Sequence, residues 1–238
     1  MRVDLSTRAD GLVELMDDPG ADLAMLERTY DRFRFVNAAV ARPDLLLRRD
    51  VLPRARRGRV RILDVGAGGG DVSRMIARRL RRAGLDAEVT ALDADDRAVR
   101  WAAANDAGAG VRYRRALAAE LVAEGDRYDV VFSNHVLHHL TDAERQVMLD
   151  DTRRLVRPDG VVVHRDIARS RAAYTLFDVA TGALAPTFLR GSFIRIDGLL
   201  SIRRSYTPRE LRAVAPPGWT VRRALPARLE LRWNEPAG

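Results

Sequence analysis

Between residues 59 and 167 the sequence alternates short apolar runs with longer amphipathic runs. The apolar runs predict five strands, at residues 60–66, 88–95, 111–117, 128–134 and 161–167, and the amphipathic runs predict helices at 71–83, 97–105 and 141–156. Strands that alternate with helices form a parallel sheet, because each crossover helix packs on a face of the sheet. We therefore predict a doubly wound α/β fold whose ligand binds beyond the carboxyl ends of the strands.

The segments on either side of this region have other patterns. Residues 1–58 carry apolar side chains at helical spacing and predict an N-terminal helical cap on the core of residues 59–167. Residues 168–205 have aromatic side chains without a strand period and predict a lid or substrate-binding insertion. Residues 206–238 predict a helix, opened by a capping box at Thr207 and Glu210, and then two antiparallel strands around Pro226 that complete the sheet.

A glycine-rich loop, DVGAGGGD, joins the first predicted strand to the first helix of the core. The dinucleotide-binding fingerprint requires glycines in a G-x-G-x-x-G pattern, and its third glycine would fall at Asp71. An acid there repels a pyrophosphate at the helix N-terminus, which argues against an NAD-dependent redox enzyme. The pattern that fits is acid-x-Gly-x-Gly-x-Gly, formed by Asp64, Gly66, Gly68 and Gly70.

This loop, followed by Asp93 at the end of the second strand, resembles motif I and the ribose-binding acid of the class I S-adenosylmethionine-dependent methyltransferases. The resemblance implies a Rossmann-like sheet of seven strands, mostly parallel with an antiparallel C-terminal strand, and S-adenosylmethionine as cofactor. The implied cofactor-binding residues are Asp64, Gly66, Ala67, Gly68, Gly70, Asp93, Ala94 and Asn134. The sequence departs from the family at Leu117, where an acid often contacts the adenine; Glu120 or a backbone group is left as the substitute.

The stretch SNHVLHHL, residues 133–140, follows the fourth strand and holds three of the four histidines. If it were helical, His135, His138 and His139 would share one face. Quinone-biosynthesis and antibiotic-sugar methyltransferases have a similar LHHL or LEH element, and this resemblance implies that His139 is a base paired with Asp166 at the end of the fifth strand. Imidazole suits the removal of a hydroxyl proton at neutral pH, and a carboxylate orients it. We expect His135 to be the third catalytic candidate.

Two other readings of these histidines stay open. His135, His139 and Asp166 could form a facial triad for a metal ion, but no acidic cluster for magnesium accompanies them, so we predict no metal site. The other reading is packing beneath the cofactor, which we favour for His138 and weigh evenly with catalysis for His139. His164, inside the fifth strand, is predicted to be a core histidine with satisfied hydrogen bonds.

Charge and hydropathy exclude several classes of function. The net charge is +8, but all the basic residues are arginines, interleaved with 33 acids, which indicates solvated surface rather than a nucleic-acid site. No apolar run is long enough for a membrane span, and no signal peptide is evident, so we expect a cytoplasmic protein without a membrane partner. The absence of cysteine excludes disulfides and zinc–thiolate sites. A monomer or homodimer is expected.

The flanking segments supply candidate residues for an acceptor pocket, namely Tyr30, Phe33, Phe35, Tyr174, Phe177, Phe188 and Phe193. Such side chains suit an aromatic or apolar small molecule. We predict O-methylation of a phenolic or polyketide-like compound in secondary metabolism, such as antibiotic biosynthesis. The alternative is an S-adenosylmethionine-binding protein of the same fold that acts as a non-methylating cyclase or an assembly partner. The sequence identifies neither the acceptor nor the methylated atom.

Overall fold

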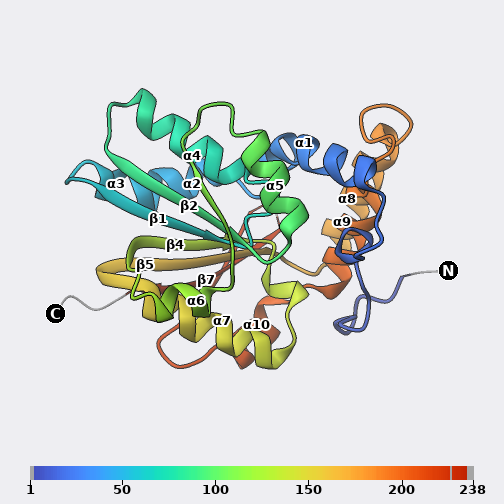
Figure 1. Ribbon diagram of the computed structural model, residues 1–238. Coiled ribbons are helices and arrows are strands. Elements are labelled where there is room, and N and C mark those ends of the chain that lie inside the picture. Colours follow the sequence, from blue (N-terminus) through green and yellow to red (C-terminus); the bar gives the residue numbers. More distant parts are fainter. Residues whose placement is uncertain (1–2, 226, 235–238) are drawn as a thin grey trace.

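The computed structural model describes residues 3–225 and 227–234, which form a seven-stranded sheet with helices on both faces (Figure 1). The strands are β1 (Val60–Val65), β2 (Ala87–Asp93), β3 (Arg112–Arg115), β4 (Tyr128–Asn134), β5 (Val156–Ile167), β6 (Thr220–Ala224) and β7 (Arg228–Asn234). Their order is β3-β2-β1-β4-β5-β7-β6, and β7 runs antiparallel to both of its neighbours. The predicted fold class and the antiparallel C-terminal pair are therefore confirmed; Pro226 lies outside the described residues.

Ten α-helices connect and flank the described strands. They are α1 (Leu23–Val40), α2 (Pro43–Leu46), α3 (Leu52–Ala55), α4 (Asp71–Arg82), α5 (Asp96–Ala104), α6 (Ala118–Ala123), α7 (Asp142–Leu155), α8 (Arg171–Leu184), α9 (Ile194–Arg204) and α10 (Pro208–Val214). Shorter turns form η1 (Leu15–Asp17), the π-type η2 (Leu47–Val51) and η3 (Leu137–His139). The capping boxes at Thr141 and Thr207 open α7 and α10 as predicted. Helix α6 escaped prediction because six residues are too few for a periodic signal.

Alternating side chains of each strand serve the two faces of the sheet, because the side-chain period of a strand is two residues. In β1, Leu63 and Val65 are buried against α6, α7 and α10, whereas Val60 and Ile62 are buried against α2, α3 and α4. This two-sided core keeps the strands in register and brings the carboxyl ends of β1, β2 and β4 to one edge.

Strand β5 begins earlier than predicted. The predicted helix ends at residue 156 and the predicted strand begins at 161, but pairing with β4 starts at Val156, opposite Tyr128, and resumes at Val161 opposite Val130. The residues between them form an irregularity in which Asp159 has a φ of 63°. They are therefore accommodated within the strand, which ends at Ile167 as predicted.

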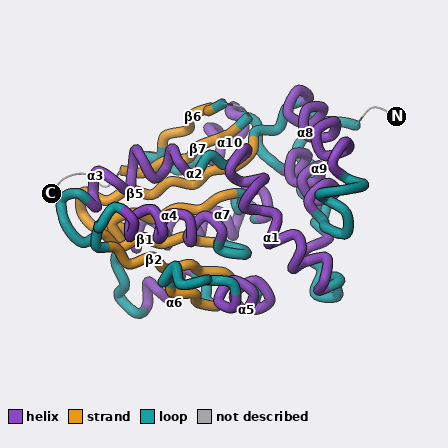
Figure 2. The backbone as a smooth tube through the Cα atoms, turned by 90° about the horizontal axis from the view of Figure 1, so that it is seen from above, coloured by secondary structure: helices purple, strands orange, loops and turns teal. Residues whose placement is uncertain are grey.

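Three segments meet beyond the carboxyl edge of the sheet. Helices α8 and α9 pack side by side at one end of the molecule, and α1 lies between them and the core helices (Figure 2). Asp197 of α9 accepts hydrogen bonds from the backbone N–H groups of Leu15 and Met16, at 2.8 and 3.0 Å, and so holds the N-terminal segment there. The predicted domain boundaries at residues 58, 167 and 205 stay predictions. No helix among the described residues combines the length and apolarity needed to cross a membrane.

Candidate active site

A cavity of about 790 Å³ opens at the carboxyl edge of the sheet, where the topology predicted a ligand. The glycine loop, Asp93, Asn134 and the histidine stretch form its floor, and side chains from α1, α8 and α9 form its walls. This volume lies within the range of small-molecule and cofactor sites. All eight predicted cofactor-binding residues except Gly70 line it.

The glycine loop exposes its backbone to the cavity. The N–H groups of Gly66 and Ala67 both donate to the carbonyl oxygen of Leu92, at 2.8 and 2.9 Å, which joins the loop to the end of β2. Gly66 has a φ of +69°, and a Cβ there would lie 2.5 Å from Cγ2 of Val136. Gly68 has a φ of +52°, and a Cβ there would meet no atom within 4 Å. Gly66 therefore allows close packing beneath the loop, whereas Gly68 leaves open space.

Asp93 is held in a single orientation at the end of β2. Its Oδ2 accepts a hydrogen bond from Gly68 N at 2.7 Å, and its Oδ1 accepts one from Asp95 N at 2.9 Å. Burial raises the pKa of Asp93, against the lowering effect of these two bonds. Each carboxylate oxygen keeps a free lone pair for ligand hydroxyls.

Three carboxylates in this part of the cavity form no ion pair at contact distance with a described residue, although the charge of Arg74 acts on Asp71. Within residues 3–225 and 227–234, no ion pair involves Asp64, Asp71 or Asp93. Burial raises the pKa of Asp64 to about 8, although Ser73 donates to it, and burial also raises the pKa of Asp71. Carboxylates in this state favour a ligand that brings positive charge. A cofactor with a sulfonium group and an ammonium group meets this preference better than a dinucleotide does.

Asn134 adds an unused acceptor to this wall. Its Oδ1 is buried and makes no hydrogen bond. A buried acceptor without a partner costs free energy, and a ligand donor in the cavity removes that cost.

The substitute for the missing adenine-contacting acid is not Glu120. Its carboxylate accepts a hydrogen bond from Leu117 N at 2.7 Å, at the start of α6, and does not line the cavity. Leu117 itself does line the cavity. Only an apolar surface and backbone groups are therefore offered at this position.

The histidine stretch is not a single helix. His135 has a left-handed φ of 57°, and only Leu137–His139 form a helical turn, η3. The three histidines therefore do not share one helical face. His138 is completely buried, whereas about a quarter of the side chain of His135 and of His139 is exposed.

The expected pairing of His139 with Asp166 is wrong, because Asp166 contacts His138. Oδ1 of Asp166 lies 2.7 Å from Nδ1 of His138, and Oδ2 accepts a hydrogen bond from the backbone N–H of His138 at 2.9 Å. Within η3, His138 is the residue that contacts Asp166 at the end of β5, whereas Nδ1 of His139 contacts Asp17. Burial alone would lower the pKa of His138, but Asp166 and Glu14 outweigh it and raise that pKa to about 9. His135 is the other neighbour of Asp166, at 3.7 Å.

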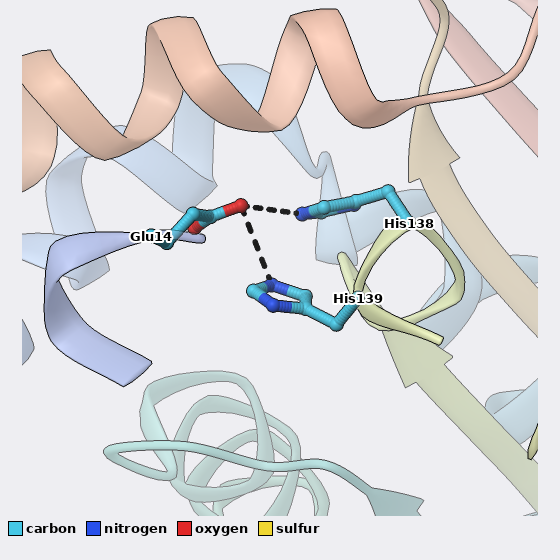
Figure 3. Close-up of side chains that lie close together, drawn as sticks. All are labelled: Glu14, His138 and His139. Carbon is cyan, nitrogen blue, oxygen red and sulfur yellow. Dashed lines mark ion pairs between the residues drawn. The ribbon is translucent and has the colours of Figure 1, made fainter. Parts of the chain in front are cut away.

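His139 is paired with the N-terminal segment instead. Its Nδ1 lies 3.0 Å from Oδ2 of Asp17, and its Nε2 lies 3.7 Å from Oε1 of Glu14 (Figure 3). Arg204 of α9 lies 3.8 Å from Glu14 and 3.6 Å from Asp17. Glu14, Asp17 and Arg204 were missed by the sequence analysis. The acidic run ELMDDP was visible, but nothing in it indicated contact with residues 138 and 139.

The other predictions for this region are confirmed in part. His164 is a core histidine, as predicted, with Ser133 Oγ 2.8 Å from Nδ1 and Thr152 Oγ1 3.1 Å from Nε2. Of the seven aromatic candidates for the acceptor pocket, Tyr30, Phe33 and Phe177 line the cavity. The others do not line it: Phe35, Tyr174, Phe188 and Phe193.

Sequence comparison places the central part of the chain among known proteins. Residues 62–160 match a family model described as a methyltransferase domain. The chain is 34% identical over 120 residues to a ubiquinone biosynthesis O-methyltransferase of Maricaulis maris (strain MCS10), covering 49% of this chain and 44% of that protein. It is 32% identical over 126 residues to the protein of the same name from Rhizobium etli (strain CIAT 652), covering 52% and 47%. The chain thus spans about half the length of the curated relatives it matches.

Structural comparison extends the similarity of fold to nearly the whole chain. The plantazolicin methyltransferase BpumL, in complex with a pentazolic desmethylPZN analog and SAH, aligns with a TM-score of 0.63 over 93% of both chains at 12% identity. At this identity the likeness concerns the fold alone. The chain therefore has the fold of this methyltransferase, and its residues 62–160 match the methyltransferase domain model.

Proposed function

We propose that the protein transfers a methyl group from S-adenosylmethionine to a hydroxyl oxygen of a small aromatic or apolar molecule. The observation that carries this proposal is that one cavity contains both the glycine loop with Asp93 and the partly exposed His135 and His139. A reaction between two bound molecules depends mostly on holding them in contact, and a shared cavity provides that arrangement.

The cofactor end would bind through the predicted residues. When bound, S-adenosylmethionine supplies a sulfonium-activated methyl group. Asp93 would accept hydrogen bonds from the ribose hydroxyls, and the backbone of Gly66 to Gly68 would contact the aminoacyl part. Asn134 Oδ1, which has no hydrogen-bond partner in the described part of the chain, would accept a hydrogen bond from the cofactor. Burial raises the pKa of Asp64, Asp71 and Asp93, and the cationic cofactor would stabilise their ionised form more than its neutral-sulfur product does.

The acceptor end would be formed by Phe33 and Phe177, with His135 and His139 at the reacting atom, whereas Tyr30 lies beside Gly69 of the glycine loop. Hydroxyl oxygens are weak nucleophiles until they lose a proton, and this end of the cavity concentrates groups that promote that loss. The names of the curated relatives, O-methyltransferases of ubiquinone biosynthesis, support an oxygen acceptor. A phenolic or polyketide-like metabolite fits both features.

Calorimetry and a methyl-transfer assay test the proposal in two stages. S-adenosylmethionine should bind with a stoichiometry of one, and NADH should not; the reverse result would exclude a methyltransferase. Transfer from methyl-labelled cofactor is then measured with a panel of phenols and hydroxylated polyketides. His139→Ala should lower turnover by about 100-fold or more while cofactor affinity changes little, as expected for a group acting at the proton.

The same experiment separates the alternative function. A non-methylating cyclase or assembly partner would bind S-adenosylmethionine with unchanged affinity in His139→Ala, and no acceptor of the panel would become labelled. Full activity of His139→Ala would leave only a packing role for this residue.

A further inference from the structure

Three side chains from distant parts of the sequence converge at the acceptor end of the cavity. Glu14 Oε1 lies 3.2 Å from Nε2 of His138 and 3.7 Å from Nε2 of His139, and these three atoms all lie within 4.8 Å of one another (Figure 3). Glu14 and His138 are buried, with 3% and 0% exposure, and His139 faces the cavity. The convergence is therefore sheltered from bulk water on one side and open to a ligand on the other.

The outer nitrogen of each ring is already committed. His138 Nδ1 contacts Asp166 at 2.7 Å, and His139 Nδ1 contacts Asp17 at 3.0 Å. The Nε2 atoms of both rings are the atoms that approach Glu14 Oε1. Ser201 Oγ donates a hydrogen bond to the same oxygen at 2.9 Å. The cluster therefore presents two ring nitrogens and one carboxylate oxygen at one place.

The Nε2 atom of His138 is left without a hydrogen bond of normal geometry, although Glu14 Oε1 is only 3.2 Å away. Three carboxylates contact the two rings, those of Glu14, Asp17 and Asp166, whereas Arg204 is the basic side chain that lies beside Glu14 and Asp17. The cluster is therefore rich in carboxylates and attracts a cation.

We propose that Glu14, His138 and His139 bind a divalent transition-metal ion, through Oε1 and the two Nε2 atoms. Two imidazoles and one carboxylate are a ligand set that suits zinc, and also iron, cobalt or nickel. Asp166 and Asp17 occupy the positions of the carboxylates that commonly orient metal-binding histidines from behind. This set differs from the triad of His135, His139 and Asp166 weighed in the sequence analysis, because Glu14 is the carboxylate ligand and Asp166 supports His138.

Three protein ligands leave coordination positions open, which distinguishes catalytic sites from structural ones. The open side faces the cavity, since His139 lines it. With both of its nitrogens occupied, His139 would then act through the ion and not as a base itself: the ion would bind the acceptor oxygen there and make its proton more acidic. This role rests on the proposed function, whereas metal binding itself does not.

The binding test uses untagged protein, freed of metal by a chelator, and titration with Zn²⁺ and Co²⁺ by calorimetry and visible absorption. We expect one ion per chain. Glu14→Gln and His139→Gln should each weaken Zn²⁺ binding at least 100-fold. Asp17→Asn should weaken it by about 10- to 100-fold, because Asp17 orients the His139 ring. Glu27→Gln, the same chemical change on the exposed face of α1, should bind Zn²⁺ like the unmodified protein.

Two results would overturn the inference. One is the absence of stoichiometric binding; the other is binding that Glu14→Gln and His139→Gln leave unchanged, which would mean adventitious surface ligands. Folding of each variant is checked by circular dichroism, and the partly exposed His139 keeps the test informative if Glu14→Gln does not fold. Because S-adenosylmethionine affinity is measured in the same samples without metal, loss of the metal site and loss of the proposed function are separate outcomes.

Discussion

Substitution of Gly66 by alanine tests the close packing beneath the glycine loop. The left-handed φ of +69° costs a residue with a Cβ about 1–2 kcal/mol. The new Cβ would also lie 2.5 Å from Cγ2 of Val136, well inside the usual carbon–carbon separation. Overpacking of this kind costs about 1–3 kcal/mol. Gly66→Ala should therefore lower the free energy of unfolding by about 2–5 kcal/mol.

Gly68→Ala is the matched control in the same loop. Its φ of +52° carries a similar backbone cost, but its Cβ would meet no atom within 4 Å. We expect a loss of only about 1–2 kcal/mol in the free energy of unfolding, measured by urea denaturation. Gly68 lines the cavity, so the methyl group that Gly68→Ala adds should occupy space at the cofactor site. We expect a larger loss in the free energy of S-adenosylmethionine binding, measured by calorimetry, than in the free energy of unfolding.

A double variant isolates the steric part of the prediction. Val136→Ala removes the methyl groups that the new Cβ of Gly66→Ala would meet, so combining the two should recover about 1–3 kcal/mol relative to additivity. Equal destabilisation by Gly66→Ala and Gly68→Ala, together with strict additivity in the double variant, would refute the reasoning.

Two further predictions concern single carboxylate and imidazole groups. Asp93→Ala should weaken S-adenosylmethionine binding by about 10- to 100-fold, since hydrogen bonds to a charged group contribute about 1.5–3 kcal/mol. Calorimetry measures the affinity, with Arg100→Ala at an exposed position as the control. Unchanged affinity of Asp93→Ala would contradict the ribose assignment. Burial lowers the pKa of His164 to about 3, below the ordinary value of 6.5. Between these two pH values the unfolded chain therefore binds a proton that the native protein does not. The contribution of neutral His164 to the free energy of unfolding is fully present above pH 6.5. About 2 kcal/mol of it is lost as the pH falls from 7 to 5. His164→Gln should remove this part of the acid destabilisation in urea unfolding at the two pH values, and an identical slope in both proteins would count against it.

The local pattern of the sequence determined the fold and the cofactor end of the site. Strand and helix periods, the capping boxes at Thr141 and Thr207 and the glycine loop are all properties of neighbouring residues, and the burial of alternate side chains on a parallel sheet leaves little freedom in how they assemble. Asp93 could be placed for the same reason, because a residue at the end of a parallel strand must lie at the carboxyl edge.

The partners of the histidines were decided by tertiary structure alone. Neighbours in sequence, His138 and His139 both approach Glu14, but their Nδ1 atoms contact different carboxylates, Asp166 and Asp17. This arrangement depends on the single turn of η3 after the left-handed His135, a backbone conformation that no periodicity reveals. Asp197 brings Glu14 to them from the far end of the chain through two backbone hydrogen bonds. Contacts between such distant segments depend on the packing of the whole molecule, so the histidine stretch became a carboxylate–imidazole cluster only in the folded protein.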